Sequence, residues 1–304
     1  MLKRYIGGPL AGVVGFLLAM ITLVSYFTLF FAVSLLKFLP WRPLQRWATA
    51  RLVGIADGWI MSVNYLFDVC LGIEYDVQGF AGLNPQGRYL VIANHRAWSD
   101  IFALFYIYPG RIPFPRFFMK RSLLWIPLIG YVCWVLDAPF MHRLTKSQLK
   151  RKPELRGRDL EVTRRACQKY RDIPVTIVNY MEGTRATPEK RLARGSPYKH
   201  LLRPKTDSVE FILNAMGDLL DGIIDLTTAY PPGVAPNFVN LVCGRVTPVK
   251  VRARVLPVPH EWLKGDLREN PEMQKRFRAW VGELWARKDA EIEQLEREFA
   301  EKSA

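Results

Sequence analysis

The chain contains few of the residues that build metal sites and disulfide frameworks. Its 304 residues include only four cysteines and four histidines. The cysteines stand apart from one another, and none lies near a histidine in the sequence; they are Cys70, Cys133, Cys167 and Cys243. Zinc ligands usually come in closely spaced pairs, and small disulfide-stabilised domains are richer in cysteine. The sequence therefore argues against a zinc site and a disulfide framework, and it fits reduced thiols in a cytoplasmic setting.

One long stretch of the chain lacks charged side chains altogether. Residues 10–36 are almost entirely apolar, and a helix of that length exceeds the roughly 30 Å hydrocarbon core of a bilayer. The stretch is too long for a signal-peptide core, and no A-x-A cleavage site follows it. We therefore predict a membrane anchor over residues 1–40, formed by one helix or by a helical hairpin. A buried core helix is the alternative.

Acidic residues are also in short supply, with 28 Asp and Glu against 43 Lys and Arg, a net charge of +15. Basic residues are more frequent after the apolar stretch than before it, which places the bulk of the chain in the cytoplasm. A bacterial inner membrane is the expected location. Beside a membrane, a basic surface attracts anionic headgroups, and acyl carrier protein and coenzyme A are also negatively charged. A solvated basic face and a nucleic-acid surface are the alternatives.

The rest of the chain divides into three parts by composition. Residues 41–80 mix tryptophans and apolar residues with a few charges, which indicates an interfacial helical segment. Residues 81–262 alternate apolar strands with helices, which predicts one α/β catalytic domain with a largely parallel or mixed sheet flanked by helices. Residues 263–304 are dense in Glu, Lys and Arg and predict a charged C-terminal helix.

Hydrophobic periodicity places the individual elements of the α/β domain. Strands are expected at residues 89–94, 131–141, 173–181, 223–231, 238–244 and 249–258. Helices are expected at residues 99–108, 157–171 and 208–218, the first with Ser99 as its N-cap.

The stretch NHRAWSD, residues 94–100, carries a histidine and an aspartate five positions apart. Such a pair lies on different sides of an α-helix and could not meet there. His95 and Asp100 can meet if the histidine ends the strand and the aspartate begins the next helix. The carboxylate would then hold the Nδ1–H of the imidazole and leave the other nitrogen free to remove a proton. Taken alone, the stretch fits an exposed histidine beside a helix-capping aspartate equally well.

Three further blocks of sequence favour the interpretation of His95 and Asp100 as a catalytic pair. N-H-x-x-x-x-D after an apolar strand resembles the first motif of the PlsC-like glycerolipid acyltransferases, the family of the lysophosphatidic acid acyltransferases. FMKRSLLWIPLIGY (118–131), EGTR (182–185) and DLTTAYPPGVAP (225–236) are similar to the family's second, third and fourth blocks, in the same order. The four blocks span about half of the chain. The residues between His95 and Asp100 depart from the family's frequent small polar pair, and this form resembles a branch with different acceptors or acyl preferences.

The resemblance assigns roles to the strand-end residues. It implies that His95 is a general base oriented by Asp100, and that Arg185 and Lys120 bind the phosphate of the acceptor. Arginine binds phosphate bidentately, although a surface salt bridge would also explain Arg185. The other candidates share these blocks or flank them: Gly183 and Thr184 in the phosphate-binding turn, with Glu182, Asn94 and Arg143 in support. Glu182 could orient Arg185 or backbone donors, or it could simply pair with a basic neighbour.

The expected activity is transfer of a fatty acyl group from acyl-CoA or acyl-carrier protein to the free hydroxyl of a lysophospholipid. The acceptor implied first is 1-acyl-glycerol-3-phosphate, which would give phosphatidic acid. No nucleophile motif is present, so we expect direct transfer, with no bound cofactor, no metal and no nucleic-acid partner. Backbone N–H groups near residues 95–100 are the expected oxyanion donors. The alternatives are another lysolipid or aminolipid acceptor, or a basic membrane-anchored binding protein without catalysis.

Overall fold

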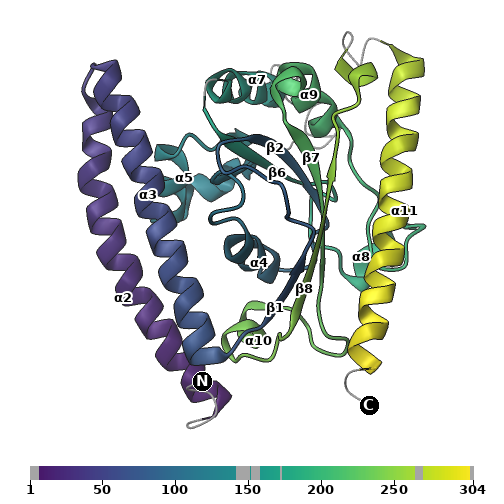
Figure 1. Ribbon diagram of the computed structural model, residues 1–304, viewed down its shortest axis with the longest axis horizontal. Helices are drawn as coiled ribbons and strands as arrows, with labels where there is room; N and C mark the ends of the chain where they lie inside the picture. The colour runs from purple at the N-terminus through teal and green to yellow at the C-terminus, as the bar shows by residue number, and fades with distance from the viewer. Residues whose placement is uncertain (1–6, 142–150, 152–157, 172, 264–269, 302–304) are drawn as a thin grey trace.

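The computed structural model describes residues 7–141, 151, 158–171, 173–263 and 270–301. One six-stranded mixed sheet with helices on both faces forms its centre (Figure 1), as the sequence predicts. In spatial order the strands are β1 (Tyr75–Gln78), β8 (Val249–Leu256), β7 (Gly222–Ala229), β2 (Arg88–Ala93), β6 (Val175–Tyr180) and β3 (Pro115–Phe117). The strand β1 precedes residue 81, where the sequence placed the start of the catalytic domain.

Four neighbouring strands of the sheet run in the same direction. These four strands are β7, β2, β6 and β3. Strand β8 is antiparallel to β7, and β1 pairs with β8 in parallel. The carboxyl ends of the four parallel strands therefore meet at one edge of the sheet. In open α/β sheets this edge is where ligands bind.

Side chains of the central strands alternate between two cores, one on each face of the sheet. On β2, Tyr89, Val91 and Ala93 pack with helices α3 and α4, whereas Leu90 and Ile92 pack with α7, α9 and α11. Such alternation is the period of two that a strand buried on both faces requires. The helices involved are α3 (Arg42–Leu66), α4 (Ser99–Ile107), α7 (Arg158–Tyr170), α9 (Asp207–Met216) and α11 (Pro271–Glu301).

The N-terminal apolar stretch forms a helix that lies beside a second long helix. α2 (Gly8–Ser34) runs into the short turn η1 (Leu35–Phe38), and α3 returns antiparallel to it (Figure 1). Among the described residues, Gly8–Phe38 is the one stretch that is long and apolar enough to cross a bilayer. Many of its large side chains, such as Leu17 and Ile21, are exposed. The α2–α3 pair thus presents an apolar surface on the outside of the molecule.

Helix α2 contacts the rest of the protein at both of its ends. Near the start, a Cβ on Gly12 would lie 2.4 Å from the carbonyl oxygen of Val242, so only glycine allows the helix to approach so closely. Just beyond the end, the ammonium of Lys37 lies 3.1 Å from the carboxylate of Asp137. The Ser34 hydroxyl is 2.6 Å from the hydroxyl of Tyr131. The helix is therefore fixed along the domain rather than projecting from it.

Two strands predicted from β-forming residues are wrong. In the stretch 131–141 the first five residues belong to helix α5 (Ile129–Val135). Only the last two form a strand, β5 (Phe140–Met141), which pairs with β4 (Met119–Lys120). Residues 238–244 form helix α10 (Phe238–Val242), which α2 covers. Long-range packing overrides local propensity at both places. The remaining short elements are η2 (Phe67–Leu71), η3 (Arg121–Trp125), α8 (Pro188–Ala193), η5 (Gly217–Leu219) and η6 (His260–Leu263).

Candidate active site

The histidine and the aspartate of the NHRAWSD stretch lie in contact at the carboxyl edge of the sheet. His95 follows β2, and Asp100 lies in the first turn of α4. The Nδ1 atom of His95 is 2.8 Å from Oδ2 of Asp100. The aspartate side chain is 1% exposed and the histidine side chain 19%. Within the described part of the chain the second ring nitrogen, Nε2, makes no hydrogen bond. The pair thus has the geometry of an oriented base.

The Asp100 carboxylate receives three hydrogen bonds besides the one from His95. Its Oδ2 accepts from the backbone amides of Arg96 at 2.7 Å and Ala97 at 2.9 Å, and its Oδ1 accepts from the hydroxyl of Tyr230 at 2.6 Å. Burial and the nearby charge of Asp100 raise the pKa of Tyr230 well above its usual value, so its hydroxyl stays protonated and donates. These donors stabilise the negative charge of the buried carboxylate.

The predicted N-cap role of Ser99 is wrong. The helix begins at Ser99 itself, and the serine hydroxyl donates to the carbonyl of Pro236 at 2.7 Å. The Asp100 side chain instead binds the two amides that precede the helix. A side-chain carboxylate at this position favours both the turn and the start of α4.

The imidazole of His95 lies at the end of a stack of aromatic rings. The ring of Tyr180, the last residue of β6, stacks on His95 with centroids 4.3 Å apart and an angle of 24° between the planes. Phe117, the last residue of β3, is nearly parallel to Tyr180 at 6.3 Å. The stack lets His95 turn little about its side-chain bonds. Neither Tyr180 nor Tyr230 was among the site residues expected from the sequence.

Glu182 joins the histidine loop to the EGTR turn. Its buried carboxylate accepts hydrogen bonds from the backbone amides of His95 and Leu202, both at 2.8 Å. Burial raises its pKa to about 7, against the opposing effect of these two bonds. A further bond of 2.7 Å runs from the Ala186 amide to the His95 carbonyl. Of the three roles open to Glu182, the geometry supports the second, in which the carboxylate holds backbone donors.

Arg185 lies on the exposed side of the same turn. Its guanidinium is 5.9 Å from the centre of the Trp98 ring, a distance at which a cation and an indole attract. Gly183 has a φ of 65°, which favours glycine, and a Cβ there would meet the side chain of Lys205 at 3.3 Å. The ammonium of Lys190 donates to the Thr184 hydroxyl at 3.0 Å. The EGTR turn therefore carries an exposed arginine among other basic side chains.

The other predicted site residues occupy different positions. Asn94 is fully buried and exchanges two hydrogen bonds of 2.9 and 3.0 Å with the backbone of Thr228, so it joins the ends of β2 and β7. Lys120 is exposed on β4, which follows β3 at the same edge as the EGTR turn. No hydrogen bond in the described part of the chain links Lys120 to the His95 or Arg185 loops. Arg143 lies outside the described residues.

The backbone amides next to the histidine already donate hydrogen bonds within the protein. Those of His95, Arg96 and Ala97 donate to the carboxylates of Glu182 and Asp100. These three N–H groups therefore hold the loop together and are not available to an oxyanion, contrary to the expectation for residues 95–97.

The C-terminal helix reaches the histidine loop. The Nη1 atom of Arg96 is 2.8 Å from Oε1 of Glu296 on α11. The indole N–H of Trp285, also on α11, donates to the carbonyl of Leu202 at 2.9 Å. Through Leu202, whose amide binds Glu182, α11 supports both loops of the site.

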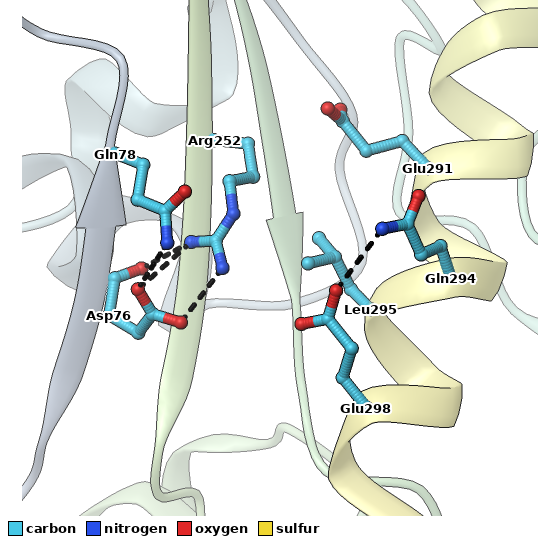
Figure 2. A pocket seen from close by; sticks show the side chains of 7 residues that line it. All are labelled: Asp76, Gln78, Arg252, Glu291, Gln294, Leu295 and Glu298. Carbon is cyan, nitrogen blue, oxygen red and sulfur yellow. Dashed lines mark hydrogen bonds and ion pairs between the residues drawn. The ribbon is translucent and has the colours of Figure 1, made fainter.

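A separate pocket lies between the edge of the sheet and α11, with a volume of about 290 Å³. Figure 2 shows side chains from β1 and β8 on one side of it and side chains from α11 on the other. The Asp76–Arg252 ion pair, with atoms 2.8 Å apart, lies within it. None of its lining residues belongs to the loops that carry His95 and Arg185; they are Asp76, Gln78, Arg252, Glu291, Gln294, Leu295 and Glu298.

Fold and site together define a class of enzyme. A buried aspartate orients a histidine at the carboxyl edge of a mixed α/β sheet, and an exposed arginine follows the neighbouring strand. Such a site can take a proton from a hydroxyl group while a cation holds an anionic part of the same molecule.

Comparison with protein families identifies the class more closely. Residues 74–231, more than half of the chain, match the family model described as acyltransferase. The chain belongs to this acyltransferase family. The resemblance read from the four sequence blocks is thereby confirmed.

Individual relatives are distant. Lysocardiolipin acyltransferase 1 of Danio rerio is 25% identical over 268 residues, which are 82% of this chain and 62% of that protein. The chain thus spans less than two thirds of that relative. The 1-acyl-sn-glycerol-3-phosphate acyltransferase alpha of Homo sapiens is 31% identical over 85 residues, 28% of this chain and 27% of that protein.

A solved structure shares the fold. The 1-acyl-sn-glycerophosphate acyltransferase PlsC of Thermotoga maritima superposes with a TM-score of 0.53 at 16% identity, over 93% of this chain and 97% of that one. The likeness extends over nearly the whole of both chains, and at this identity it shows the fold alone.

Proposed function

We propose that the protein transfers a fatty acyl group from a thioester to the free hydroxyl of a lysophospholipid, with 1-acyl-glycerol-3-phosphate as the first candidate acceptor. The observation that carries this proposal is the 2.8 Å contact between His95 and the buried Asp100 at the carboxyl edge of the sheet. It supplies the one thing that a weakly acidic hydroxyl needs, which is a correctly oriented base.

In the proposed reaction Nε2 of His95 takes the proton of the acceptor hydroxyl as the oxygen attacks the thioester carbonyl. The C–O bond forms, the C–S bond then breaks, and the imidazolium returns its proton to the departing thiolate. Asp100 stabilises the imidazolium between these steps without taking its proton. A base of this kind contributes about 10²–10⁴ in rate, so positioning of the two substrates supplies much of the rest.

Arg185 is proposed to bind the phosphate of the acceptor. It is exposed and follows the strand next to that of His95, and its planar guanidinium fits two phosphate oxygens at once. Trp98 lies against the guanidinium and limits its movement. Lys120, exposed at the same edge of the sheet, is proposed as a second and weaker contact.

The apolar helix α2 is the proposed membrane attachment. Helix α2 contacts the domain near Gly12 and again at Lys37. If the helix crossed the bilayer, the domain attached to it would therefore have to enter the membrane as well. The arrangement supports a helix that lies in the plane of one leaflet, with its exposed apolar face about 5–10 Å deep among the headgroups and upper acyl chains. On the cytoplasmic leaflet this would bring the site to both amphiphilic substrates.

The relatives supply a second candidate acceptor. The match to the Danio rerio protein named lysocardiolipin acyltransferase 1 covers 82% of this chain, far more than the match to the Homo sapiens 1-acyl-sn-glycerol-3-phosphate enzyme. A lysolipid with a larger phosphate-containing headgroup is therefore an acceptor to test. The donor is proposed to be acyl-CoA or acyl-carrier protein. Both are negatively charged and would be attracted to a basic protein.

The experiment that tests the proposal is an acyl-transfer assay on the purified full chain. A panel of lysophosphatidate, lysocardiolipin and other lysolipids would be offered with acyl-CoA and with acyl-carrier-protein thioesters, and the acylated product and free thiol measured. We expect product from at least one phosphate-bearing lysolipid. Absence of product with every acceptor and both donors would contradict the proposal and favour a binding protein.

A further inference from the structure

The segment that follows β4 exposes an unusual group of large apolar side chains. Trp125, at the end of η3, is 82% exposed, and Ile126 and Ile129 beside it are also exposed. Trp134 on α5 and Phe38 at the end of η1 add to the same surface. These five residues form what we call the apolar patch. Single exposed apolar residues are common, but a cluster of this size usually marks a contact surface.

The backbone holds this cluster outward in a rigid turn. Leu128 has φ 63° and ψ −59°, and the Ile129 amide donates to the carbonyl of Pro127 at 2.8 Å. These features define a γ-turn whose central residue has a positive φ. This is the rarer form of the γ-turn, and it is strained for a residue other than glycine. Just after it, a Cβ on Gly130 would lie 2.1 Å from the carbonyl oxygen of Leu124. Strain of this kind persists where the surroundings fix it, often at functional surfaces.

The patch continues the exposed apolar surface of α2. The rings of Phe38 and Trp134 lie 6.2 Å apart, and Lys37 donates to the carbonyl of Val135 at 2.5 Å. About two helical turns earlier, the ring of Phe31 on α2 lies 5.8 Å from that of Tyr131 on α5. The C-terminal end of α2 and the patch therefore form one surface, although about 90 residues separate them in the sequence.

We propose that the apolar patch inserts into the headgroup region of an anionic phospholipid bilayer, as a second membrane contact built on the catalytic domain itself. The proposal rests on the membrane attachment given above for α2. Tryptophan favours the membrane interface, where its ring is buried and its N–H remains hydrated. Exposed Lys120, five residues before Trp125, places positive charge beside the patch, as an anionic surface requires.

The second contact has a consequence for the reaction. β4, with the proposed phosphate contact Lys120, leads directly into η3 and Trp125. Insertion of the patch would therefore hold that part of the site at headgroup depth, where the phosphate of a membrane-bound acceptor lies. Loss of the patch should impair acylation of lipids in a bilayer and spare acceptors that are dissolved in water.

Fluorescence quenching tests the insertion directly. The full chain is bound to vesicles of phosphatidylcholine and phosphatidylglycerol that carry bromine on their acyl chains, and the quenched fraction of tryptophan emission is measured. We expect Trp125→Phe to remove a quenched component. Trp280→Phe, on the packed α11, should not. An unchanged quenched fraction in Trp125→Phe would overturn the proposal.

Activity provides the second readout. Trp125→Glu should acylate vesicle-bound lysophosphatidate about tenfold more slowly, and a short-chain soluble acceptor at the wild-type rate. Leu192→Glu is the matched control, because Leu192 is 83% exposed. It belongs to α8, a helix that lies on the other side of the molecule from α2 (Figure 1). The proposal would be overturned if Leu192→Glu slowed the acylation of vesicle-bound lysophosphatidate as much as Trp125→Glu does. It would also be overturned if Trp125→Glu slowed acylation of the vesicle-bound and the soluble acceptor equally. If the wild type acylated nothing, the proposed function would fail, while quenching would still decide the membrane contact.

Discussion

The hydroxyl of Tyr230 donates a 2.6 Å hydrogen bond to Oδ1 of Asp100, while His95 lies 2.8 Å from the other oxygen of the same carboxylate. The two partners come from the ends of β7 and β2, which are neighbours in the sheet. Asp100 is therefore held on both sides, and its orientation toward the imidazole does not depend on His95 alone. A buried aspartate with one partner would be free to turn.

Removing the Tyr230 hydroxyl should weaken the orientation of the base. We predict that Tyr230→Phe lowers kcat about tenfold and changes the KM of the acceptor little, since one hydrogen bond to a charged group is lost and no substrate contact is. Steady-state kinetics with both substrates varied would measure this. Tyr170→Phe, which removes a buried hydroxyl that donates to the carbonyl of Asp137, is the control and should keep kcat. Equal kcat values for Tyr230→Phe and the wild type would contradict the role of Tyr230.

Arg185 should contribute to binding rather than to the chemical step. We predict that Arg185→Lys raises the KM of lysophosphatidate about 10- to 100-fold with kcat largely kept, because lysine keeps the charge but loses the bidentate contact. Monoacylglycerol, which lacks the phosphate, should show no such change. Arg194→Lys, an exposed arginine at the end of α8, is the control. A KM that rises equally for both acceptors would show that Arg185 does not bind phosphate.

Glu182 should make stability depend on pH in a characteristic direction. Its pKa is about 7 in the folded protein against an ordinary value of 4.5, so between these values the folded state holds a proton that the unfolded state has lost. Its contribution to the free energy of unfolding is therefore complete below about pH 4.5 and is lost as the pH rises through 7.

Denaturant unfolding at several pH values would measure this contribution. Relative to Glu182→Gln, the wild type should lose up to about 1.4 kcal/mol of unfolding free energy per pH unit over that interval. Glu189→Gln, an exposed neighbour on α8, should keep the wild-type slope. Parallel curves for the wild type and Glu182→Gln would show that the carboxyl group does not titrate there.

Local patterns in the sequence were sufficient for the central strands and for the histidine–aspartate pair. The run 89–94 alternates between two cores, and its end determines where His95 lies. Spacing alone excluded a shared helix for His95 and Asp100, which left the strand end as the place where they meet. The EGTR turn followed from the same logic, since its strand lies next to β2.

Features that depend on distant contacts could not be predicted from the sequence. Tyr230 meets Asp100 across 130 residues, and the stack of Tyr180 on His95 depends on the pairing of β2 with β6. The β-forming run 238–244 became helix α10, where α2 packs against it at Gly12. Local signals carry no information about which strands become neighbours or what covers a short helix. Such contacts decide the finer geometry of the site.

The central claim is that His95, oriented by Asp100, is the base in thioester-dependent acylation of a lysophospholipid. The most direct test compares the purified wild type with His95→Ala and Asp100→Asn on the best acceptor, with circular dichroism to confirm that all three are folded. We predict that His95→Ala lowers kcat by about 10²–10⁴-fold and that Asp100→Asn lowers it nearly as much. Wild-type turnover by folded His95→Ala would contradict the account.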